Sequence, residues 1–170
     1  MKVLLTGACG YKGSVLLPKL DELHHEVTTM DMGWFGGEPN IKADIRTTLP
    51  PTGFDAVIHL AGIANDPCGE LDSKLTWEVN VLGTMRLADW AVRSGVKQFI
   101  FASSASVYGV KGLGSITEDL PLEPVSDYNK TKMCAERVLL SYTDKMIVQI
   151  IRPATVCGVS PRMRLDTMVN

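Results

Sequence analysis

The stretch Lys2–Gly13, which reads KVLLTGACGYKG, determines how the rest of this sequence is interpreted. The apolar run Lys2–Thr6 predicts a buried strand, and glycines spaced G-x-x-G-x-x-G follow it directly at Gly7, Gly10 and Gly13. Glycines at such a turn let the backbone approach a ligand closely, and a helix that begins there directs its N–H groups towards a phosphate. The stretch therefore indicates a strand–turn–helix unit that binds a nucleotide, although the same spacing also occurs in tight turns that bind nothing.

Strand-like and helix-like segments alternate along the rest of the chain. Apolar, β-rich runs predict five further strands, over Glu26–Met30, Ile41–Asp44, Phe54–Leu60, Lys97–Ser103 and Lys145–Ile151. Apolar residues at helical spacing predict helices over Tyr11–Leu23, Leu71–Ser94 and Asp127–Tyr142. Because strands joined by crossovers of this length pair in parallel, the sequence predicts an α/β fold with a doubly wound parallel sheet of about six strands.

The composition is that of an ordinary globular domain. The chain has 170 residues, of which 45% are hydrophobic and 21% charged, and its formal net charge is −2. No block of like charge indicates a nucleic-acid partner, and no apolar run is long enough to span a bilayer. The four cysteines show neither a CxxC pair nor a metal-ligand spacing, so we expect free thiols and no metal site. Since the glycine turn leaves no room for a signal peptide, we expect a cytoplasmic protein.

Asp31 stands at the end of the second predicted strand, 18 residues beyond Gly13. An acid at about this distance from a glycine-rich turn accepts hydrogen bonds from a ribose of a bound dinucleotide. Its charge also repels the 2′-phosphate of NADP, and no arginine or lysine lies between Met32 and Glu38 to offset that repulsion. The sequence therefore favours NAD, unless Asp31 is only a turn residue. The stretch from Asp31 to Asp44 is too short for a crossover helix, so we expect an irregular connection there.

Tyr128 and Lys132 are four residues apart on a predicted helix and therefore lie on one face of it. A tyrosine, with an ordinary pKa of about 10, is a poor base at neutral pH. An ammonium ~5 Å away, at an effective dielectric constant of about 20, favours the phenolate by roughly 3 kcal/mol, or about two pKa units. We therefore expect Lys132 to make Tyr128 a usable acid–base group, although such a pair is also common by chance.

These signals occur in a fixed order, and further motifs stand between them. Along the chain the motifs are TGACGYKG (Thr6–Gly13), Asp31, Asp44-Ile45-Arg46, HLAG (His59–Gly62), Asn80, SSASVYG (Ser103–Gly109), YNKTK (Tyr128–Lys132) and RPATVCG (Arg152–Gly158). Together they resemble the NAD-dependent sugar epimerase/dehydratase branch of the extended short-chain dehydrogenase/reductase superfamily. The resemblance covers essentially the whole chain and implies a Rossmann-type fold.

The resemblance implies roles for residues at the matching positions. Tyr128 would be the catalytic acid–base, Ser104 would hydrogen-bond the substrate oxygen, and Lys132 would bind the nicotinamide ribose and lower the pKa of the tyrosine. NAD would be held by the glycine turn, by strand ends and by one helix asparagine: Gly7, Gly10, Tyr11, Lys12, Gly13, Asp31, Asp44, Ile45, Leu60, Ala61, Gly62, Asn80, Lys132 and Pro153. The alternative interpretation of Asn80 is that it lies on the surface of a helix and does not contact the cofactor.

Several reactions are compatible with the resemblance. Dehydratases of this family carry an acidic residue just before the V-Y-G triplet, whereas Ala105 and Ser106 stand there in this chain. We therefore expect an epimerase or oxidoreductase that acts on a UDP- or GDP-sugar by transient oxidation, with a 4,6-dehydratase as the weaker interpretation. The alternative from another class is a non-catalytic NAD-binding module.

Relatives of this family continue into a substrate-binding domain and dimerise through two long helices. We therefore expect residues 1–158 to form an NAD-binding Rossmann domain, and 159–170 to begin a substrate-binding region that is mostly missing. The resemblance also implies a homodimer that packs the helices Leu71–Ser94 and Asp127–Tyr142 against those of a second copy.

Overall fold

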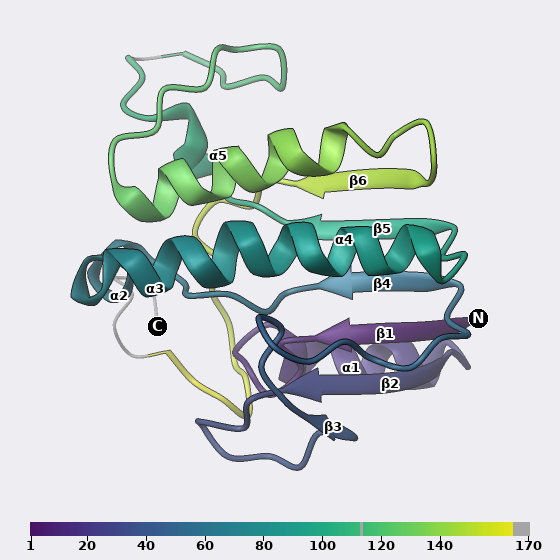
Figure 1. Ribbon diagram of the computed structural model, residues 1–170. Coiled ribbons are helices and arrows are strands. Elements are labelled where there is room, and N and C mark those ends of the chain that lie inside the picture. Colours follow the sequence, from purple (N-terminus) through teal and green to yellow (C-terminus); the bar gives the residue numbers. More distant parts are fainter. Residues whose placement is uncertain (113, 165–170) are drawn as a thin grey trace.

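The computed structural model describes residues 1–112 and 114–164, and over these ranges it confirms the predicted α/β fold. A parallel six-stranded sheet runs through the molecule in the order β3-β2-β1-β4-β5-β6 (Figure 1). Its strands are β1 (Lys2–Thr6), β2 (Glu26–Asp31), β3 (Ile41–Lys42), β4 (Ala56–His59), β5 (Gln98–Ala102) and β6 (Ile147–Ile151). The carboxyl ends of parallel strands meet at one edge, and the strand order reverses between β1 and β4, where such sheets bind ligands.

Helices cover both faces of the sheet, as a doubly wound fold requires. In Figure 1, α1 (Gly13–Glu22) lies behind the sheet, while α4 (Thr84–Arg93) and α5 (Asp127–Leu140) lie side by side in front of it. Ser126 caps α5 by accepting a hydrogen bond from the N–H of Asn129. Within the described ranges, none of the helices has the length and apolar character needed to cross a membrane.

The segment predicted as one helix over Leu71–Ser94 is instead divided, which corrects that prediction. α2 (Asp66–Leu71) and α3 (Ser73–Trp77) are separated by Asp72, which is extended and caps α3 by accepting from the N–H of Leu75. A π-helical turn, Glu78–Gly83, then joins α3 to α4. A π turn holds an extra residue, so it rotates the residues that follow around the helix axis.

This rotation disrupts part of the apolar stripe that the helical spacing predicts for that segment, while Val79 still packs against the core. Leu82 and Met85 are 54% and 42% exposed, whereas α4 buries Leu87 and Trp90 in their place. The turn lies where Gly83 meets Ile45, since a Cβ on Gly83 would be 2.9 Å from the Cδ1 atom of Ile45. Two apolar side chains that a regular helix would bury are therefore left on the outer surface.

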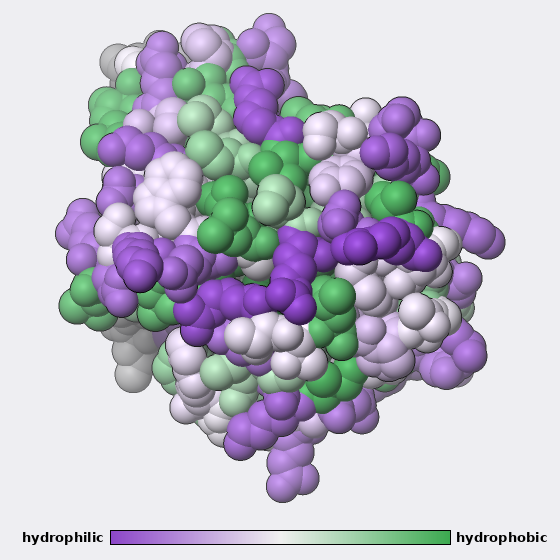
Figure 2. Space-filling model, in the orientation of Figure 1, coloured by the Kyte–Doolittle hydropathy of each residue, from purple (hydrophilic) through white to green (hydrophobic). Residues whose placement is uncertain are grey.

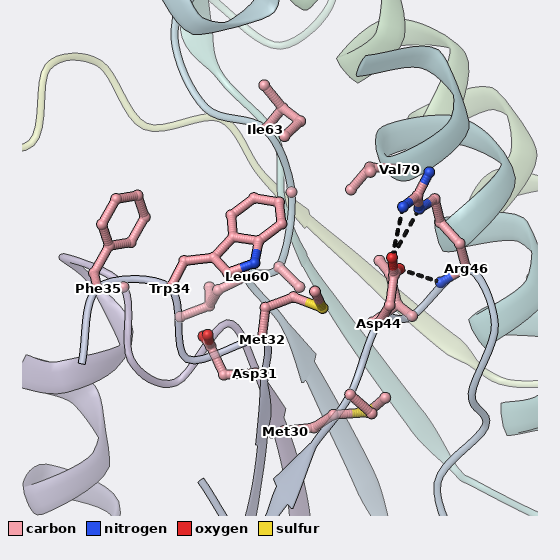
Figure 3. Close-up of a pocket in the computed structure, with 15 residues that line it drawn as sticks. Met30, Asp31, Met32, Trp34, Phe35, Asp44, Arg46, Leu60, Ile63 and Val79 are labelled. Carbon is pink, nitrogen blue, oxygen red and sulfur yellow. Dashed lines mark hydrogen bonds and ion pairs between the residues drawn. The ribbon is translucent and has the colours of Figure 1, made fainter. Parts of the chain in front are cut away.

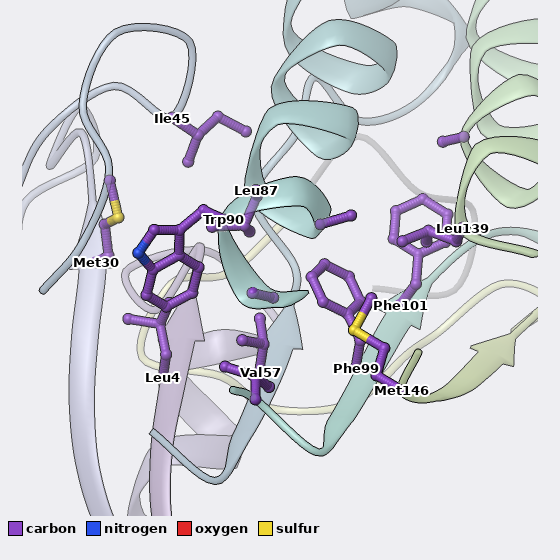
Figure 4. Close-up of a cluster of buried hydrophobic side chains, with 14 residues drawn as sticks. Leu4, Met30, Ile45, Val57, Leu87, Trp90, Phe99, Phe101, Leu139 and Met146 are labelled. Atoms are coloured by element: carbon purple, nitrogen blue, oxygen red, sulfur yellow. The ribbon is translucent and has the colours of Figure 1, made fainter. Parts of the chain in front are cut away.

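Apolar clusters lie on both faces of the sheet. The larger cluster fills the space between the strands and the helices α4 and α5, where Trp90 lies near Leu4 and Met30 (Figure 4). The smaller cluster packs Leu5 under α1, together with Ala8 and Leu20. Leu4 and Leu5 are neighbours on β1 and point to opposite faces, as the two-residue period of a strand requires.

The link between β2 and β3 is irregular, as expected from its length. Asn40 anchors it, because its side-chain oxygen accepts a 2.8 Å hydrogen bond from the N–H of Thr29. The N–H of Asn40 donates in turn to the hydroxyl of Thr29, at 2.9 Å. β1 has its predicted bounds, and the other strands and helices differ from theirs by a few residues at the ends.

The segment after β6 runs back along the carboxyl ends of the strands to the glycine turn (Figure 1). The hydroxyl of Tyr11 donates a 2.7 Å hydrogen bond to the carbonyl oxygen of Gly158. The hydroxyl of Ser160 donates a 2.9 Å hydrogen bond to the backbone carbonyl oxygen of Tyr11. The described part of the region predicted for substrate binding, 159–164, thus lies against the glycine turn. Residues 165–170 lie outside the described ranges.

Candidate active site

The glycine turn is packed so closely that two of its positions exclude any side chain. Gly7 has a φ of 73°, and a Cβ there would lie 2.5 Å from the backbone nitrogen of Ala61. A Cβ on Gly13 would lie 2.3 Å from the carbonyl oxygen of Gly7. These contacts press the turn against the end of β4, so that the N-terminus of α1 reaches the carboxyl edge of the sheet.

This end of α1 is strongly positive. Lys12 precedes the helix, no side chain caps it, and its first turn contains no acidic residue. The N-terminal end of a helix carries a partial positive charge, to which Lys12 adds its own. Burial, and then the nearby charge of Arg164, hold the pKa of Lys12 below its ordinary value. Crowded cations at a helix N-terminus suit a phosphate anion, which would relieve their mutual repulsion.

Asp31 is held beside the glycine turn by two backbone N–H groups. One carboxylate oxygen accepts from Cys9 at 3.0 Å, and the other accepts from Gly33 at 2.8 Å. Because a carboxylate has about four acceptor sites, both oxygens can still accept from a ribose. Two cations from outside the stretch Met32–Glu38 approach the loop that follows β2. Nζ of Lys42 would be 3.7 Å from a Cβ on Gly33, and the Arg162 guanidinium lies 3.9 Å from the centre of the Phe35 ring.

A pocket opens beside Asp31 at the ends of β1, β2 and β4 (Figure 3). Its lining is apolar apart from a few charged groups: Gly10, Met30, Asp31, Met32, Trp34, Phe35, Ala43, Asp44, Ile45, Arg46, Leu60, Ala61, Gly62, Ile63 and Val79. Seven of the residues predicted to hold the cofactor are among them. Trp34 and Phe35 line the pocket from the loop after β2, so their aromatic rings can pack against a flat ring bound in the pocket.

Asp44 is bound by its neighbour Arg46 on the far side of this pocket. The guanidinium of Arg46 donates to one oxygen of Asp44 at 2.7 and 2.9 Å (Figure 3), and it also donates to Glu78 at 2.9 Å. The hydrogen bonds from Arg46 hold the pKa of Asp44 below its ordinary value, so the carboxylate is ionised. Sequence reasoning missed Glu78, which is 32 residues from Arg46 along the chain.

Asn80 is buried rather than on a helix surface. Its side-chain oxygen accepts from the N–H of Ile63 at 2.9 Å, and its amide donates to the carbonyl oxygen of Ile63 at 3.0 Å and to the hydroxyl of Thr131 at 3.1 Å. Both amide protons are therefore engaged within the protein. Asn80 ties the loop after β4 to α5 and so positions Gly62, where a Cβ would lie 2.8 Å from its oxygen.

Lys132 extends from α5 into the interior of the site. Its ammonium donates a 2.9 Å hydrogen bond to the carbonyl oxygen of Ala102 and lies 4.8 Å from the centre of the Phe101 ring. Burial, and then the charge of Lys12, lower the pKa of Lys132 to about 7. The lysine therefore titrates close to neutral pH, where a fully hydrated ammonium would stay charged.

Tyr128 lies one helical turn earlier, with its ring centre 5.9 Å from the Lys132 ammonium. Burial raises the pKa of Tyr128, while a hydrogen bond with Ser104 and the charge of Arg164 act against this and Asp66 adds to it. The expectation that Lys132 lowers this pKa by itself is therefore wrong for the chain alone. The reason is that burial disfavours the phenolate, and burial is the largest effect on the pKa of Tyr128.

Ser104 follows β5 and begins the short turn Ala105–Tyr108. Its hydroxyl lies 2.7 Å from that of Ser106 and accepts from the Ser106 N–H at 3.2 Å. The carbonyl oxygen of Pro153, just after β6, accepts from the N–H of Ala105 at 2.9 Å. Two strand ends are thereby tied together at the place where Ser104 meets Tyr128.

An ion pair between Glu136 and Arg152 lies next to these strand ends, and the sequence analysis did not predict it. Glu136 is 1% exposed and accepts from Arg152 at 2.7 and 2.9 Å, and from the hydroxyl of Ser103. Arg152 also donates to the hydroxyl of Tyr108 at 2.7 Å. The signal was available, because Glu136 follows Lys132 by four residues and therefore shares its helix face.

The sequence model of the family described as "NAD dependent epimerase/dehydratase family" matches residues 3–170. The UDP-glucose 4-epimerase of Corynebacterium glutamicum is 34% identical over 155 residues, which make up 84% of this chain and 46% of that protein. The dTDP-glucose 4,6-dehydratase of Streptomyces griseus is 31% identical over 160 residues, 82% of this chain and 49% of that protein. The chain thus spans about half the length of the curated relatives it matches.

Solved structures agree with these relatives. "MoeE5 in complex with UDP-glucuronic acid and NAD" superposes with a TM-score of 0.88 at 31% identity, covering 98% of this chain and 58% of that one. The UDP-glucose 4-epimerase of Thermus thermophilus in complex with NAD gives a TM-score of 0.80 at 26% identity, covering 89% of this chain and 54% of that one. With a family match over nearly its whole length, the chain belongs to the NAD-dependent epimerase/dehydratase family.

Proposed function

We propose that this chain is the NAD-binding part of an enzyme that oxidises a nucleotide-sugar transiently, as an epimerase or an oxidoreductase. One observation carries the proposal: Ser104 hydrogen-bonds Tyr128, with Lys132 on the same helix face, at the sheet edge that also holds the glycine turn. These three residues are the proposed catalytic group. Family membership supports the proposal, since relatives of the chain are UDP-glucose 4-epimerases and a dTDP-glucose 4,6-dehydratase.

The residues present are suited to NAD. The close packing at Gly7 and Gly13 and the positive end of α1 suit a pyrophosphate, with Gly10, Tyr11 and Lys12 in the same turn. The acceptor oxygens of Asp31 suit ribose hydroxyls, and the pocket walls suit an adenine ring through residues that include Asp44, Ile45, Leu60, Ala61 and Gly62. Bound NAD would supply reversible hydride transfer. We assign Lys132 and Pro153 to the nicotinamide end, and Asn80 to positioning Gly62.

The protein side of the reaction is proton transfer and positioning. Tyr128, as a phenolate, takes the proton of the sugar hydroxyl that is oxidised and later returns it. Ser104 holds the same oxygen, so that proton and hydroxyl are aligned. Because burial raises the pKa of Tyr128 in the chain alone, forming the phenolate depends on added positive charge, which oxidised nicotinamide carries.

The residues at the V-Y-G triplet favour an epimerase or oxidoreductase over a dehydratase. Elimination of water needs an acid beside the sugar, whereas Ala105 has no polar side chain and the hydroxyl of Ser106 is engaged with Ser104 and Asn129. Neither side chain can supply a proton near neutral pH. This reasoning ranks the 4,6-dehydratase below the epimerase for this chain.

The test is calorimetric titration of the chain with NAD⁺ and with NADP⁺, followed by addition of UDP- and GDP-sugars to the NAD⁺ complex. We expect NAD⁺ to bind more tightly than NADP⁺. We also expect the absorbance of reduced nicotinamide to appear when a sugar that is a substrate is added. Tyr128→Phe is the matched control and should bind NAD⁺ without producing that absorbance. Binding of NAD⁺ with no absorbance from any sugar would support the non-catalytic module instead.

We also propose a homodimer through α4 and α5. Hydrophobic side chains gather on the face where these two helices lie side by side, among polar ones (Figure 2). Leu82 in the π turn, Met85 on α4 and Leu140 at the end of α5 are exposed. Light scattering should give a dimer for the chain and a monomer for Leu82→Glu, and a monomeric wild type would overturn the proposal.

We place the protein in the cytoplasm, since its four cysteines are all free thiols.

A further inference from the structure

The imidazole ring of His59 lies buried between β1 and the helices in front of the sheet, and the proposed reaction does not use it. His59 is the last residue of β4, is 0% exposed, and pairs with Thr6 in the register of the sheet. Its ring centre lies 5.7 Å from that of Phe101 and 5.8 Å from that of Phe99. Burial, and then the charge of Lys132, lower the pKa of His59 to about 3, so the ring is neutral near pH 7.

Each nitrogen of this ring contacts the hydroxyl of a threonine. Nδ1 lies 2.7 Å from the hydroxyl oxygen of Thr6, and Nε2 lies 2.9 Å from that of Thr84. A neutral imidazole has one nitrogen that donates and one that accepts. Thr84 donates its single hydroxyl proton to the carbonyl oxygen of Asn80 at 2.7 Å, so towards His59 it can only accept. The proton of the ring is therefore on Nε2, and Nδ1 accepts from Thr6.

The Nδ1 side of the ring leads to the glycine turn. Thr6 is the last residue of β1 and directly precedes Gly7. Because Thr6 gives its proton to His59, its oxygen faces the N–H of Ala61 as an acceptor, at 3.4 Å. The nitrogen of Ala61 is also the atom that a Cβ on Gly7 would approach to 2.5 Å. His59 thus orients the hydroxyl that joins the end of β1 to the segment on which the glycine turn packs.

The Nε2 side of the ring leads to α5 and the acid–base residue. Thr84 holds the backbone of Asn80, whose side-chain amide donates to the hydroxyl of Thr131 at 3.1 Å. Thr131 in turn donates its proton to the backbone carbonyl oxygen of Tyr128 at 2.7 Å. Thr84, Asn80 and Thr131 are each at most 2% exposed. Every hydroxyl proton in this series has one acceptor, so the direction of the whole series is fixed.

We propose that His59, neutral and with its proton on Nε2, is a positioning residue that holds both halves of the candidate active site. Through Thr6 it holds the glycine turn, and through Thr84 and Asn80 it holds the backbone of Tyr128. A ring with its proton on Nδ1 could not do both, because Thr84 would have to release Asn80 in order to donate to Nε2. The inference deepens the proposed function and rests on it for the use made of these two regions.

The first test is the protonation of the two ring nitrogens of His59, read from their ¹⁵N resonances in the chain without cofactor. We expect a neutral ring with its proton on Nε2 in the wild type and in Thr84→Ser, which keeps the hydroxyl. Thr84→Val removes the acceptor, so the proton should move to Nδ1, where Thr6 can accept it. A charged wild-type ring, a wild-type proton on Nδ1, or a ring unchanged in Thr84→Val would overturn the inference.

The second test separates positioning from a general loss of stability, by calorimetric titration with NAD⁺ of variants that are folded at the temperature used. Thr6→Val should lower the affinity about tenfold, and Thr6→Ser should stay within about twofold of the wild type. Thr76→Val is the matched control, because Thr76 is equally buried and donates to the backbone carbonyl oxygen of Asp72 at 2.8 Å. It should lose stability and keep its NAD⁺ affinity.

Equal losses of affinity in Thr6→Val and Thr76→Val, or no loss in Thr6→Val, would overturn the positioning role. The ring nitrogens are observed without NAD or a sugar. A wild type that binds no NAD⁺ would therefore overturn the proposed function, while the proton on His59 would still decide the inference. The two failures are in this way distinguishable.

Discussion

The ammonium of Lys132 donates a 2.9 Å hydrogen bond to the carbonyl oxygen of Ala102, the last residue of β5. This bond joins α5 to the sheet at the candidate active site, and it places a charge where water is excluded. Burial therefore lowers the pKa of Lys132 from 10.5 to about 7. The consequence is a link between the protonation of one residue and the stability of the whole chain.

We predict that this residue makes the chain more stable as the pH rises from about 7 to about 10. In that window the unfolded chain holds a proton on Lys132 that the folded chain has released, so raising the pH favours folding. Below pH 7 both forms hold it, and the cost of burying the charge remains in full. Urea unfolding at several pH values should show a slope for the wild type that Lys132→Met lacks. Equal slopes in the two proteins would contradict the prediction.

Local features of the sequence predicted much of this site, because the glycine turn, Asp31 and the spacing of Tyr128 and Lys132 are local patterns. The environment of Lys132 was not predictable in this way, since its burial depends on how α5 packs on β5. Burial reverses the expected effect, so that Tyr128 has a raised and not a lowered pKa. The π turn was also missed, because it depends on a contact between Gly83 and a distant residue.

A second prediction concerns the buried pair of Glu136 and Arg152. Glu136→Gln removes the fully buried charge that pairs with the Arg152 guanidinium, whose side chain is 19% exposed. Removing one partner of a buried ion pair typically costs about 3–5 kcal/mol of stability. Urea unfolding should therefore show a loss of this order. The double variant Glu136→Gln/Arg152→Met should recover part of it, and a double variant less stable than the single one would show that the charge is not the cause.

A third prediction separates the glycines of the turn by their surroundings. Gly13→Ala places a Cβ 2.3 Å from the carbonyl oxygen of Gly7, which the turn cannot accommodate without moving. We expect a loss of thermal stability and at least about a tenfold loss of NAD⁺ affinity in calorimetry. Gly10→Ala, with its nearest atom at 3.3 Å, should be milder, and Gly112→Ala, with open space around it, is the neutral control. An equal loss in all three variants would contradict the role of close packing.

The last prediction concerns the choice between NAD and NADP. Asp31 disfavours a 2′-phosphate by its charge, while Lys42 and Arg162 approach the loop that follows it. Asp31→Ser should therefore do more than weaken NAD⁺ binding, because it leaves two cations near a position where a phosphate would lie. We expect the ratio of NADP⁺ to NAD⁺ affinity, measured by calorimetry, to rise by at least about tenfold. Asp31→Glu keeps the charge and should keep the preference for NAD⁺. Adding Lys42→Met to Asp31→Ser should remove part of the gain, and a gain that survives unchanged would show that Lys42 plays no part in it.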